Sequence, residues 1–548
     1  MPKLEISQSD LCSLIGKKIP IESLKQNILY AKGEIDGVEE DTLKVDLKDS
    51  NRPDLWSAEG IAREIKGRVT SKVGLPEYKI KRGNLVVHVD KKVSRVRPLT
   101  VCAVVRDLKI NKQVLSQMIQ LQEKVATTFG RNRKEVAIGV YDFHKIKPPI
   151  TYTTVQPEGI RFVPLEFKEE MTPKEILERH PKGKEFGHLL SGYNEYPIFI
   201  DSANQVLSMP PIINSDHTGK VDEETRDVFI ECSGYNFKFL VPALNVIVSA
   251  LADRGAKIES VKVEYHNKSV MTPDLLPKKA VVDIDYVNKV SGLKLKPKDI
   301  VKLLLQARYN PVIKGKRIEV HYPAYRQDIM HPRDVVEDVI ISYGYNKVEP
   351  LPIKYKTLGK MNEMEEASEK IGRIMSKLGM QEIMSYTLTN KDHLFRKMNV
   401  KEEKIVEIEN PVSANWNIFR NWMIPSLMEF FSNNQHVKYP QKIFEIGNVV
   451  AVDEKQETRT RDIRKLAAAI ADSKLGYHDI VAVLDGFMRS WKKKYRLRKT
   501  SHSSFIEGRM AEILVDKKTV GVIGEIRPEV LLNWKLEMPV CVFELEIA

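Results

Sequence analysis

Alternation of apolar and polar residues predicts strands in every part of the chain. Leu43, Val45 and Leu47 alternate with charged or polar residues, and a period of two is typical of a half-buried strand. The same kind of pattern or a short apolar run recurs at residues 85–89, 100–105, 281–286, 383–388, 442–450 and 466–470. These runs predict several separate sheets.

Apolar residues spaced by three and four positions predict helices between these strands. The expected helices cover residues 58–67, 112–129, 298–308, 332–343, 365–378 and 480–491. In the second of these, Leu115, Ile119 and Val125 are predicted to face the core. Ser426 is predicted to cap a further helix that carries Leu427 and Phe431.

The elements divide the chain into four expected domains. A chain of 548 residues is too long for one hydrophobic core. We expect an α+β multidomain protein with an N-terminal α/β domain (1–75), a large mixed α/β domain (85–268), a small winged-helix-like module (270–348) and a last antiparallel-sheet domain (355–548). Residues 71–84 are expected to form a linker.

The composition of the chain is informative about its function mainly through its net charge. The net charge of +13 favours a polyanionic partner such as nucleic acid, although many basic proteins bind none. The four cysteines are widely separated, so they form no zinc or redox pair and suit a reducing cytoplasm. The longest apolar run, residues 239–252, is broken by Pro242 and Asn245, so no membrane span is predicted.

Acidic residues gather at the start of the helix predicted at 332–343. Asp334, Glu337 and Asp338 are three and four positions apart and so are expected to share a face, which Asp328 could fold over. Four carboxylates without histidine or cysteine suit Mg²⁺. The alternative is that early acids complement the helix dipole, and spacing alone favours that alternative.

Two polar residues stand inside apolar strand-like runs. Ser208 lies in a Val-Leu-Ser-Met run, and Glu231 follows Val-Phe-Ile. A buried polar group needs a partner, which a polar ligand in a pocket could supply. The alternative, which we favour on sequence alone, is that each is satisfied by backbone or faces water.

Several blocks resemble the β subunits of phenylalanine–tRNA ligase, in the archaeal and eukaryotic form. They are the NRPD turn at 51–54, the blocks at 131–155, 205–221 and 226–236, the segment 410–435 with the strand 442–450, and the closing blocks 505–515 and 521–531. They occur in the family's order and extend over most of the chain.

The resemblance implies a role for each domain. Residues 85–268 are similar to the domain that hydrolyses wrongly charged tRNA, with Ser208 and Glu231 as candidate contacts for the hydroxyl of tyrosine. Family members often carry a short acidic residue and a threonine near position 231, whereas Glu231-Cys232-Ser233 stand here. In similar β subunits, acids at Asp328, Asp334, Glu337 and Asp338 bind Mg²⁺ at the contact with the α subunit.

Residues 355–548 are similar to a class II synthetase domain, yet the strand 442–450 contains no arginine to grip ATP. The resemblance therefore implies that ATP is bound by the α subunit of an α₂β₂ assembly that charges tRNA(Phe), and that this chain carries no catalytic residue for that step.

Two other functions remain open from the residues alone. One is a nucleic-acid-binding scaffold without enzyme activity, which the basic charge also fits. The other is a magnesium-dependent phosphotransferase using the acids around Asp334. The absence of a phosphate-cradling glycine loop in the sequence argues against the phosphotransferase.

Overall fold

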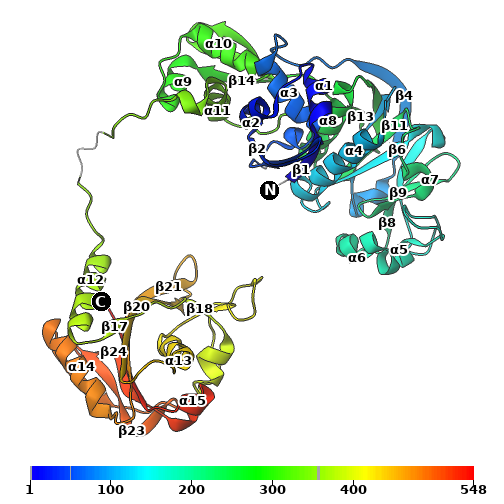
Figure 1. Ribbon diagram of the computed structural model, residues 1–548. Coiled ribbons are helices and arrows are strands. Elements are labelled where there is room, and N and C mark those ends of the chain that lie inside the picture. The colour runs from blue at the N-terminus through cyan, green and yellow to red at the C-terminus, as the bar shows by residue number, and fades with distance from the viewer. Residues whose placement is uncertain (1–2, 50, 354–357, 548) are drawn as a thin grey trace. The chain divides into compact units, whose positions relative to one another are not determined.

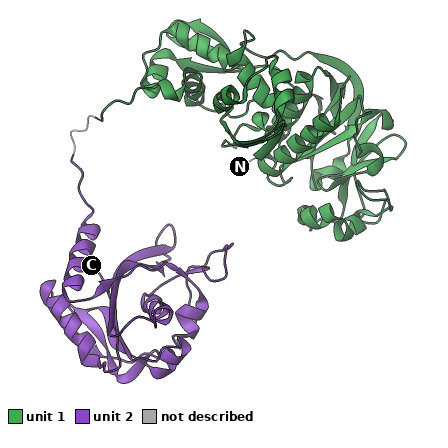
Figure 2. Ribbon diagram, in the orientation of Figure 1, with its two compact units in different colours: residues 1–352 green, residues 353–548 purple. Residues whose placement is uncertain are grey.

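The computed structural model describes residues 3–49, 51–353 and 358–547, which form two compact units. Unit 1 comprises residues 1–352 and unit 2 residues 353–548 (Figure 2). The predicted division between 348 and 355 therefore falls at the boundary of the units, although residue 355 itself lies outside the described residues. The three regions predicted within 1–348 pack together as unit 1.

The first region of unit 1 is a three-stranded antiparallel sheet with helices against it (Figure 1). Its strand order is β1-β3-β2, and the predicted strand around Leu43 is β3. The elements are β1 (Lys3–Ser7), α1 (Gln8–Ile15), α2 (Ile21–Ile28), β2 (Gly33–Glu39), β3 (Thr42–Leu47) and α3 (Ala58–Val69).

The second region is built on a ten-stranded sheet with the path β10-β9-β8-β7-β4-β12-β5-β11-β6, where β13 pairs β12. Its strands are β4 (Ile80–Val89), β5 (Leu99–Arg106), β6 (Val136–Asp142), β7 (Ile150–Val155), β8 (Tyr196–Ile200), β9 (Val206–Met209), β10 (Ile213–Asn214), β11 (Val228–Gly234), β12 (Lys257–Glu264) and β13 (Ser269–Thr272). Residues 80–84, expected to belong to a linker, begin β4.

Helices cover this sheet and connect its strands. They are α4 (Lys112–Lys124), α5 (Pro173–Arg179), α6 (Pro181–Phe186), α7 (Asp216–Gly219) and α8 (Phe237–Asp253). The apolar helix α8 packs on β5 and β11. None of the helices in the described part of the chain is both long enough and apolar enough to cross a membrane.

The third region combines a small antiparallel sheet, in the order β14-β16-β15, with three helices. The elements are β14 (Lys278–Asp283), α9 (Ile284–Ser291), α10 (Pro297–Gln306), β15 (Asn310–Lys314), β16 (Arg317–Tyr322) and α11 (Pro332–Tyr343). The strand predicted at 281–286 ends early, because the Asp283 carboxylate accepts hydrogen bonds from the backbone N–H groups of Asp285 and Tyr286 and starts α9. The winged-helix likeness stays a prediction.

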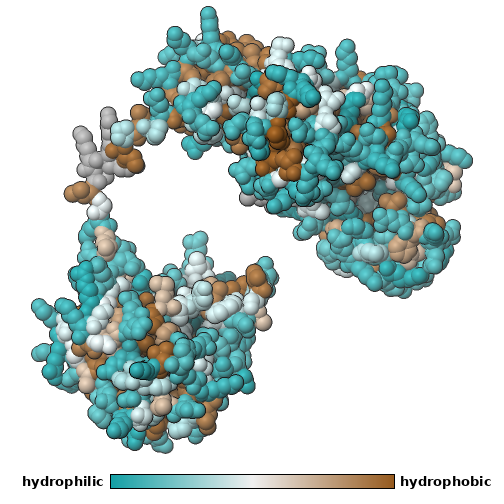
Figure 3. Space-filling view, in the orientation of Figure 1, coloured by the Kyte–Doolittle hydropathy of each residue, from teal (hydrophilic) through white to brown (hydrophobic). Residues whose placement is uncertain are grey.

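Unit 2 is a seven-stranded sheet, antiparallel except where β17 pairs β20, in the order β17-β20-β21-β25-β24-β23-β22. Its main elements are α12 (Glu363–Lys377), β17 (Gln381–Glu382), β18 (Leu388–Thr389), β19 (Ile418–Phe419), α13 (Ile424–Asn433), β20 (Gln441–Val452), β21 (Thr460–Ala471), α14 (Tyr477–Ser490), β22 (Tyr495–Lys499), β23 (Phe505–Val515), β24 (Lys518–Ile526), α15 (Pro528–Asn533) and β25 (Val540–Glu546). One apolar core packs α13 and α15 on the sheet, and another packs α12 and α14. On the face that Figure 3 shows, hydrophilic side chains cover most of each unit.

Three further details of the prediction are wrong. The strand expected at 383–388 does not form, because β17 ends at Glu382 and β18 begins only at Leu388. Ser426 does not cap α13, which begins two residues earlier at Ile424 and has Pro425 in its first turn; the Ser426 hydroxyl instead accepts a hydrogen bond from Arg420. Ile119 does not face a core, since 54% of its surface is exposed.

Buried ion pairs join the first and third regions of unit 1. The Arg326 guanidinium binds both oxygens of Asp328 at 2.7 and 2.5 Å and reaches Asp338 at 2.9 Å. Arg52, from the NRPD turn, binds Asp54 at 2.9 and 2.8 Å and lies 3.9 Å from Asp328. Burial opposes ionisation of Asp338, but the charge of Arg326 outweighs it and lowers the pKa of Asp338 to about 2.

We expect Arg326→Met to destabilise the chain by about 3–5 kcal/mol at pH 7, because it leaves Asp328 and Asp338 buried without their cation. Urea unfolding measures the change. The matched control is Arg179→Met, which removes an exposed pair with Glu169 and should cost no more than about 1 kcal/mol. Equal losses in both variants would contradict the assigned role of the network.

Candidate functional site

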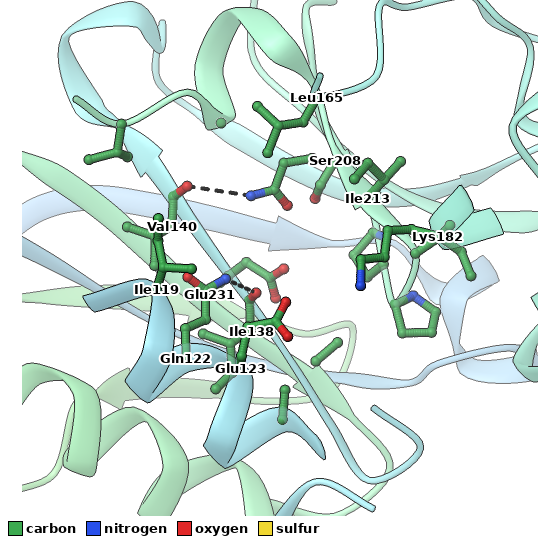
Figure 4. Close-up of a pocket in the computed structure, with 18 of the residues that line it drawn as sticks. Ile119, Gln122, Glu123, Ile138, Val140, Leu165, Lys182, Ser208, Ile213 and Glu231 are labelled. Atoms are coloured by element: carbon green, nitrogen blue, oxygen red, sulfur yellow. Dashed lines mark hydrogen bonds between the residues drawn. The ribbon is translucent and has the colours of Figure 1, made fainter. Parts of the chain in front are cut away.

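The structure brings Ser208 and Glu231 into one cavity of about 450 Å³ in the second region of unit 1. The cavity lies where the two ends of the large sheet meet, because β6 ends the strand path on one side and β9–β10 end it on the other. Figure 4 shows Ser208 and Glu231 among its lining residues, with Gln122 and Glu123 of α4 on one side and Lys182 on another.

Tyr141 of β6 joins the two polar residues. Its hydroxyl lies 2.7 Å from the Ser208 Oγ and 3.2 Å from the Glu231 Oε1. All three side chains are buried, and the Glu231 Oε2 has no hydrogen-bond partner in the described part of the chain. An unpaired buried oxygen costs free energy, so it is ready to interact with a polar ligand group.

Burial also changes the protonation of Glu231. Loss of hydration raises the pKa of this carboxyl group to about 8, against the opposing effects of the Arg97 charge and of the hydrogen bond from Tyr141. Arg97 is itself buried and donates to the Ser233 hydroxyl at 3.1 Å. At neutral pH Glu231 is therefore mostly a neutral acid that can donate as well as accept.

The walls of the cavity are largely apolar. They include Met118 and Ile119 of α4, Ile138 and Val140 of β6, and Ile213 of β10. The exposure of Ile119 is explained by this position on an open wall. Charged side chains occur around the same cavity: Glu123, Arg133, Glu166, Lys182, Asp216 and Lys220.

Side chains from both sides bind the free edge of β6. The Gln122 amide donates to the Ile138 carbonyl at 2.7 Å, and the Asn214 amide donates to the Val140 carbonyl at 3.5 Å, as the dashed lines in Figure 4 mark. Arg133 donates to the carbonyls of Pro211 and Ile212 at 3.2 and 2.8 Å. These bonds tie α4 and the β9–β10 segment to one strand and keep the cavity open between them.

Sequence reasoning missed Tyr141 and Gly139. A Cβ atom at position 139 would lie 2.0 Å from the Tyr141 hydroxyl, so only glycine lets the ring fold back toward Glu231. A glycine two residues before a tyrosine in a buried strand was the available signal, because both residues point to the same face.

The lining residues described here include no histidine or cysteine. The nearby thiols of Cys102 and Cys232 are buried, and burial raises the pKa of each well above its ordinary value. His144 is instead paired with Asp227 at 3.1 Å. The cavity offers a polar binding end but no thiol or histidine nucleophile.

The four acids predicted to bind Mg²⁺ do not converge. Asp328 and Asp338 are buried against Arg326, and Asp338 also accepts from the Tyr309 hydroxyl at 2.5 Å. Glu337 is partly exposed and pairs with Lys32 at 2.9 Å. Asp334 accepts from the backbone N–H groups of Met330 and His331 at the start of α11.

Arginine, lysine and backbone donors bind these carboxylates in the structure, and the Mg²⁺ site predicted at Asp328, Asp334, Glu337 and Asp338 stays a prediction. Among the residues that the structure describes, no three acidic, histidine or cysteine side chains form a metal-ligand group. These donors do not fit a magnesium ion in this arrangement, and the dipole and capping alternative describes Asp334.

Unit 2 contains a buried arginine at the strand that the sequence singled out. Arg420 donates to Glu445 of β20 at 2.8 Å, to the Asn448 carbonyl at 3.0 Å and to Ser385 at 2.7 Å. A Cβ atom at Gly447 would lie 2.4 Å from the Arg420 Nη2, which explains the glycine as a close approach. Because protein groups bind this guanidinium, it is not free to bind phosphate.

Family models match most of the chain. A "B3/4 domain" model matches residues 83–240, a "tRNA synthetase B5 domain" model matches 280–345, and a "Phenylalanyl tRNA synthetase beta chain CLM domain" model matches 349–547. The first of these ranges contains the whole sheet edge at β6 and both Ser208 and Glu231.

Curated relatives match over nine-tenths of the chain or more. The phenylalanine–tRNA ligase β subunit of Pyrococcus abyssi is 49% identical, with 100% of this chain and 99% of the relative covered, and that of Korarchaeum cryptofilum is 42% identical over 91% and 90%. A crystal structure of an N-terminal fragment of the β subunit from Pyrococcus horikoshii aligns with a TM-score of 0.62 at 51% identity, covering 63% of this chain and all of the fragment. These matches confirm the resemblance seen in the sequence: the chain belongs to the family of phenylalanine–tRNA ligase β subunits, components of an aminoacyl-tRNA synthetase.

Proposed function

We propose that this chain works with an α subunit, as an α₂β₂ assembly in the cytoplasm, to attach phenylalanine to tRNA(Phe) and to hydrolyse tRNA(Phe) that carries tyrosine. The observation that carries the hydrolytic role is the cavity lined by Ser208 and Glu231, whose side chains are joined by the Tyr141 hydroxyl.

The cavity suits the side chain of tyrosine. Its apolar walls can bury an aromatic ring, and the group of Glu231, Tyr141 and Ser208 can bind a hydroxyl at the buried end. Phenylalanine would fill the same walls but leave the Glu231 Oε2 without a partner. A site built to bind a hydroxyl discriminates strongly against the ligand that lacks it.

Cleavage in this cavity is assigned to water and not to a protein nucleophile. The residues described around it offer neither a thiol nor a histidine, so the ester would be attacked by a water held by polar groups near the open side. Lys182 and Arg133 line the same cavity and carry the positive charge that an RNA 3′ end requires.

Exposed groups support contacts with the two proposed partners. Met384 and Tyr386 are 95% and 75% exposed, and the Tyr386 ring lies 5.2 Å from that of Trp416. Exposed aromatic and apolar side chains of this kind suit contact with an α subunit. The lysines Lys294, Lys296, Lys298 and Lys302 are also exposed and can contact tRNA phosphates.

The synthetic reaction is assigned to the α subunit. The isolated chain should therefore give no phenylalanine-dependent pyrophosphate exchange, because the Arg420 guanidinium is bound by Glu445 and Ser385. Adding the α subunit should restore exchange. Exchange by the isolated chain at the rate of the complex would contradict this assignment.

Removal of the polar side chains of Ser208 or Glu231 should slow the hydrolysis of tyrosyl-tRNA(Phe). In the complex with the α subunit, we expect Glu231→Ala and Ser208→Ala to lower the deacylation rate by about 5- to 150-fold. Each variant removes a partner of the bound tyrosine hydroxyl, and a buried polar group left unpaired costs roughly 1–3 kcal/mol. The control is Glu158→Ala, an exposed carboxylate that pairs with Lys174 outside this cavity. If both pocket variants match the wild type, these residues do not bind the hydroxyl.

The neutral state of Glu231 can be tested by stability. The pKa of Glu231 is about 8 in the folded protein against an ordinary 4.5. The contribution of this group to the free energy of unfolding is therefore complete below pH 4.5 and is lost as the pH rises to 8. The free energy of unfolding of the wild type, relative to Glu231→Gln, should fall by roughly 2–4 kcal/mol between pH 5 and pH 8 and then level off. Urea unfolding at four pH values measures this, and a constant difference would show an ionised Glu231.

A further inference from the structure

A second cavity, of about 140 Å³, lies where the three regions of unit 1 meet. It is lined by Arg63 and Lys66 of α3, by Asp253 at the end of α8 and by Arg308 just after α10. Gly67 holds α3 and the end of α10 in close approach, since a Cβ there would lie 2.4 Å from the Gln306 carbonyl oxygen. The cavity is thus a structural junction, separate from the pocket at Glu231.

Positive charge exceeds negative charge around this cavity. Four cations line it against two carboxylates: Arg63, Lys66, Lys72 and Arg308 against Glu59 and Asp253. Glu59 is already bound by Arg254, and Asp253 is shared between Arg63 at 2.7 Å and Tyr78 at 3.0 Å.

The described residues give Lys66, Lys72 and Arg308 no ion-pair partner. The excess charge at this cavity therefore has no ion-pair partner among the residues that the structure describes. Partial burial, together with the like charge of Lys72, lowers the pKa of Lys66 below its ordinary value, as expected where an anion is missing.

Two buried arginines in the wall also have unpaired donors. Arg63 is 5% exposed and Arg308 is 8% exposed. Neither the Arg63 Nη1 nor the Arg308 Nε has an acceptor among the described residues. A buried N–H of a charged group without an acceptor is costly, and most such groups are paired.

We propose that this junction binds a small tetrahedral oxyanion of the phosphate class. Guanidinium groups match the geometry of phosphate oxygens, and two arginines with two lysines are a typical donor set for such an ion. The net excess of two positive charges matches a phosphate that carries about two negative ones at neutral pH. The cavity is too small for a nucleotide, because ligands of that size need about 300 Å³ or more.

Binding would link the regions of unit 1. Arg63 belongs to the first region and Arg308 to the third, so an anion held by both arginines stabilises the junction in proportion to its occupancy. Free phosphate and one phosphate of an RNA backbone present similar tetrahedral oxygens, although the backbone phosphate carries one negative charge instead of about two. Separate titrations distinguish these two sources.

The test uses the full chain with two variants, Arg308→Gln and Lys66→Gln, and with Lys3→Gln as the matched control. Lys3 is an exposed lysine of the first region that pairs with Asp36 at 3.3 Å and does not line this cavity. Lys66→Gln is included because its partly exposed position tolerates substitution if Arg308→Gln does not fold. Calorimetric titration with inorganic phosphate at constant ionic strength gives stoichiometry and affinity, and a parallel titration uses tRNA.

We expect one phosphate per chain, with at least tenfold weaker binding in both variants and unchanged binding in Lys3→Gln. If phosphate does not bind but both variants weaken tRNA binding more than Lys3→Gln does, the oxyanion is an RNA phosphate. If neither titration distinguishes the variants from the control, the proposal is wrong.

Discussion

Arg326 and Arg52 lie buried beside Asp54, Asp328 and Asp338, and the position of the third region against the first depends on these charges being matched. Each ion would be costly to bury alone, and the arrangement is stable only because every carboxylate has a cation in contact with it. The same constraint explains why the acids of α11 do not form a separate metal-binding face. Asp338 is held inward by Arg326 and Tyr309, whereas Glu337 points to Lys32. The fold uses these acids to fix one region of unit 1 on another.

The second constraint is the meeting of the two ends of the large sheet at Tyr141. A hydroxyl that contacts both Ser208 of β9 and Glu231 of β11 fixes the width of the cavity between them. Gly139 makes this possible by leaving room for the ring, and Gln122 and Asn214 hold α4 and the β9–β10 segment to β6. The polar end is therefore held rigidly by strands, which is what precise recognition of one hydroxyl needs.

Local patterns predicted much of the secondary structure. The helix at 332–343 and the strands at 442–450 and 466–470 lie within a few residues of α11, β20 and β21, because their apolar periodicity was clear. The sequence also singled out Ser208 and Glu231, because a buried polar residue needs a partner, and the structure places both beside one cavity; their contact with a ligand stays a prediction. What failed depended on contacts between distant segments. The spacing of Asp334, Glu337 and Asp338 could not reveal Arg326 and Lys32, and the helical periodicity of residues 112–129 could not reveal that Ile119 borders a cavity.

The two cavities of unit 1 show how the same cost of burial is resolved in opposite ways. At Glu231 the chain removes the charge, because desolvation keeps the carboxyl group protonated near neutral pH. At Arg63 and Arg308 the charge cannot be removed in this way, because a guanidinium does not lose its proton in proteins. A neutral acid can donate to a hydroxyl oxygen or accept from a hydroxyl hydrogen, so it suits an uncharged ligand group such as a phenol. Buried arginines can only donate, so the ligand that would satisfy them has to accept hydrogen bonds, and the excess positive charge around them favours an anion. The protonation chemistry of the two residue types thus assigns a neutral hydroxyl to one cavity and an anion to the other.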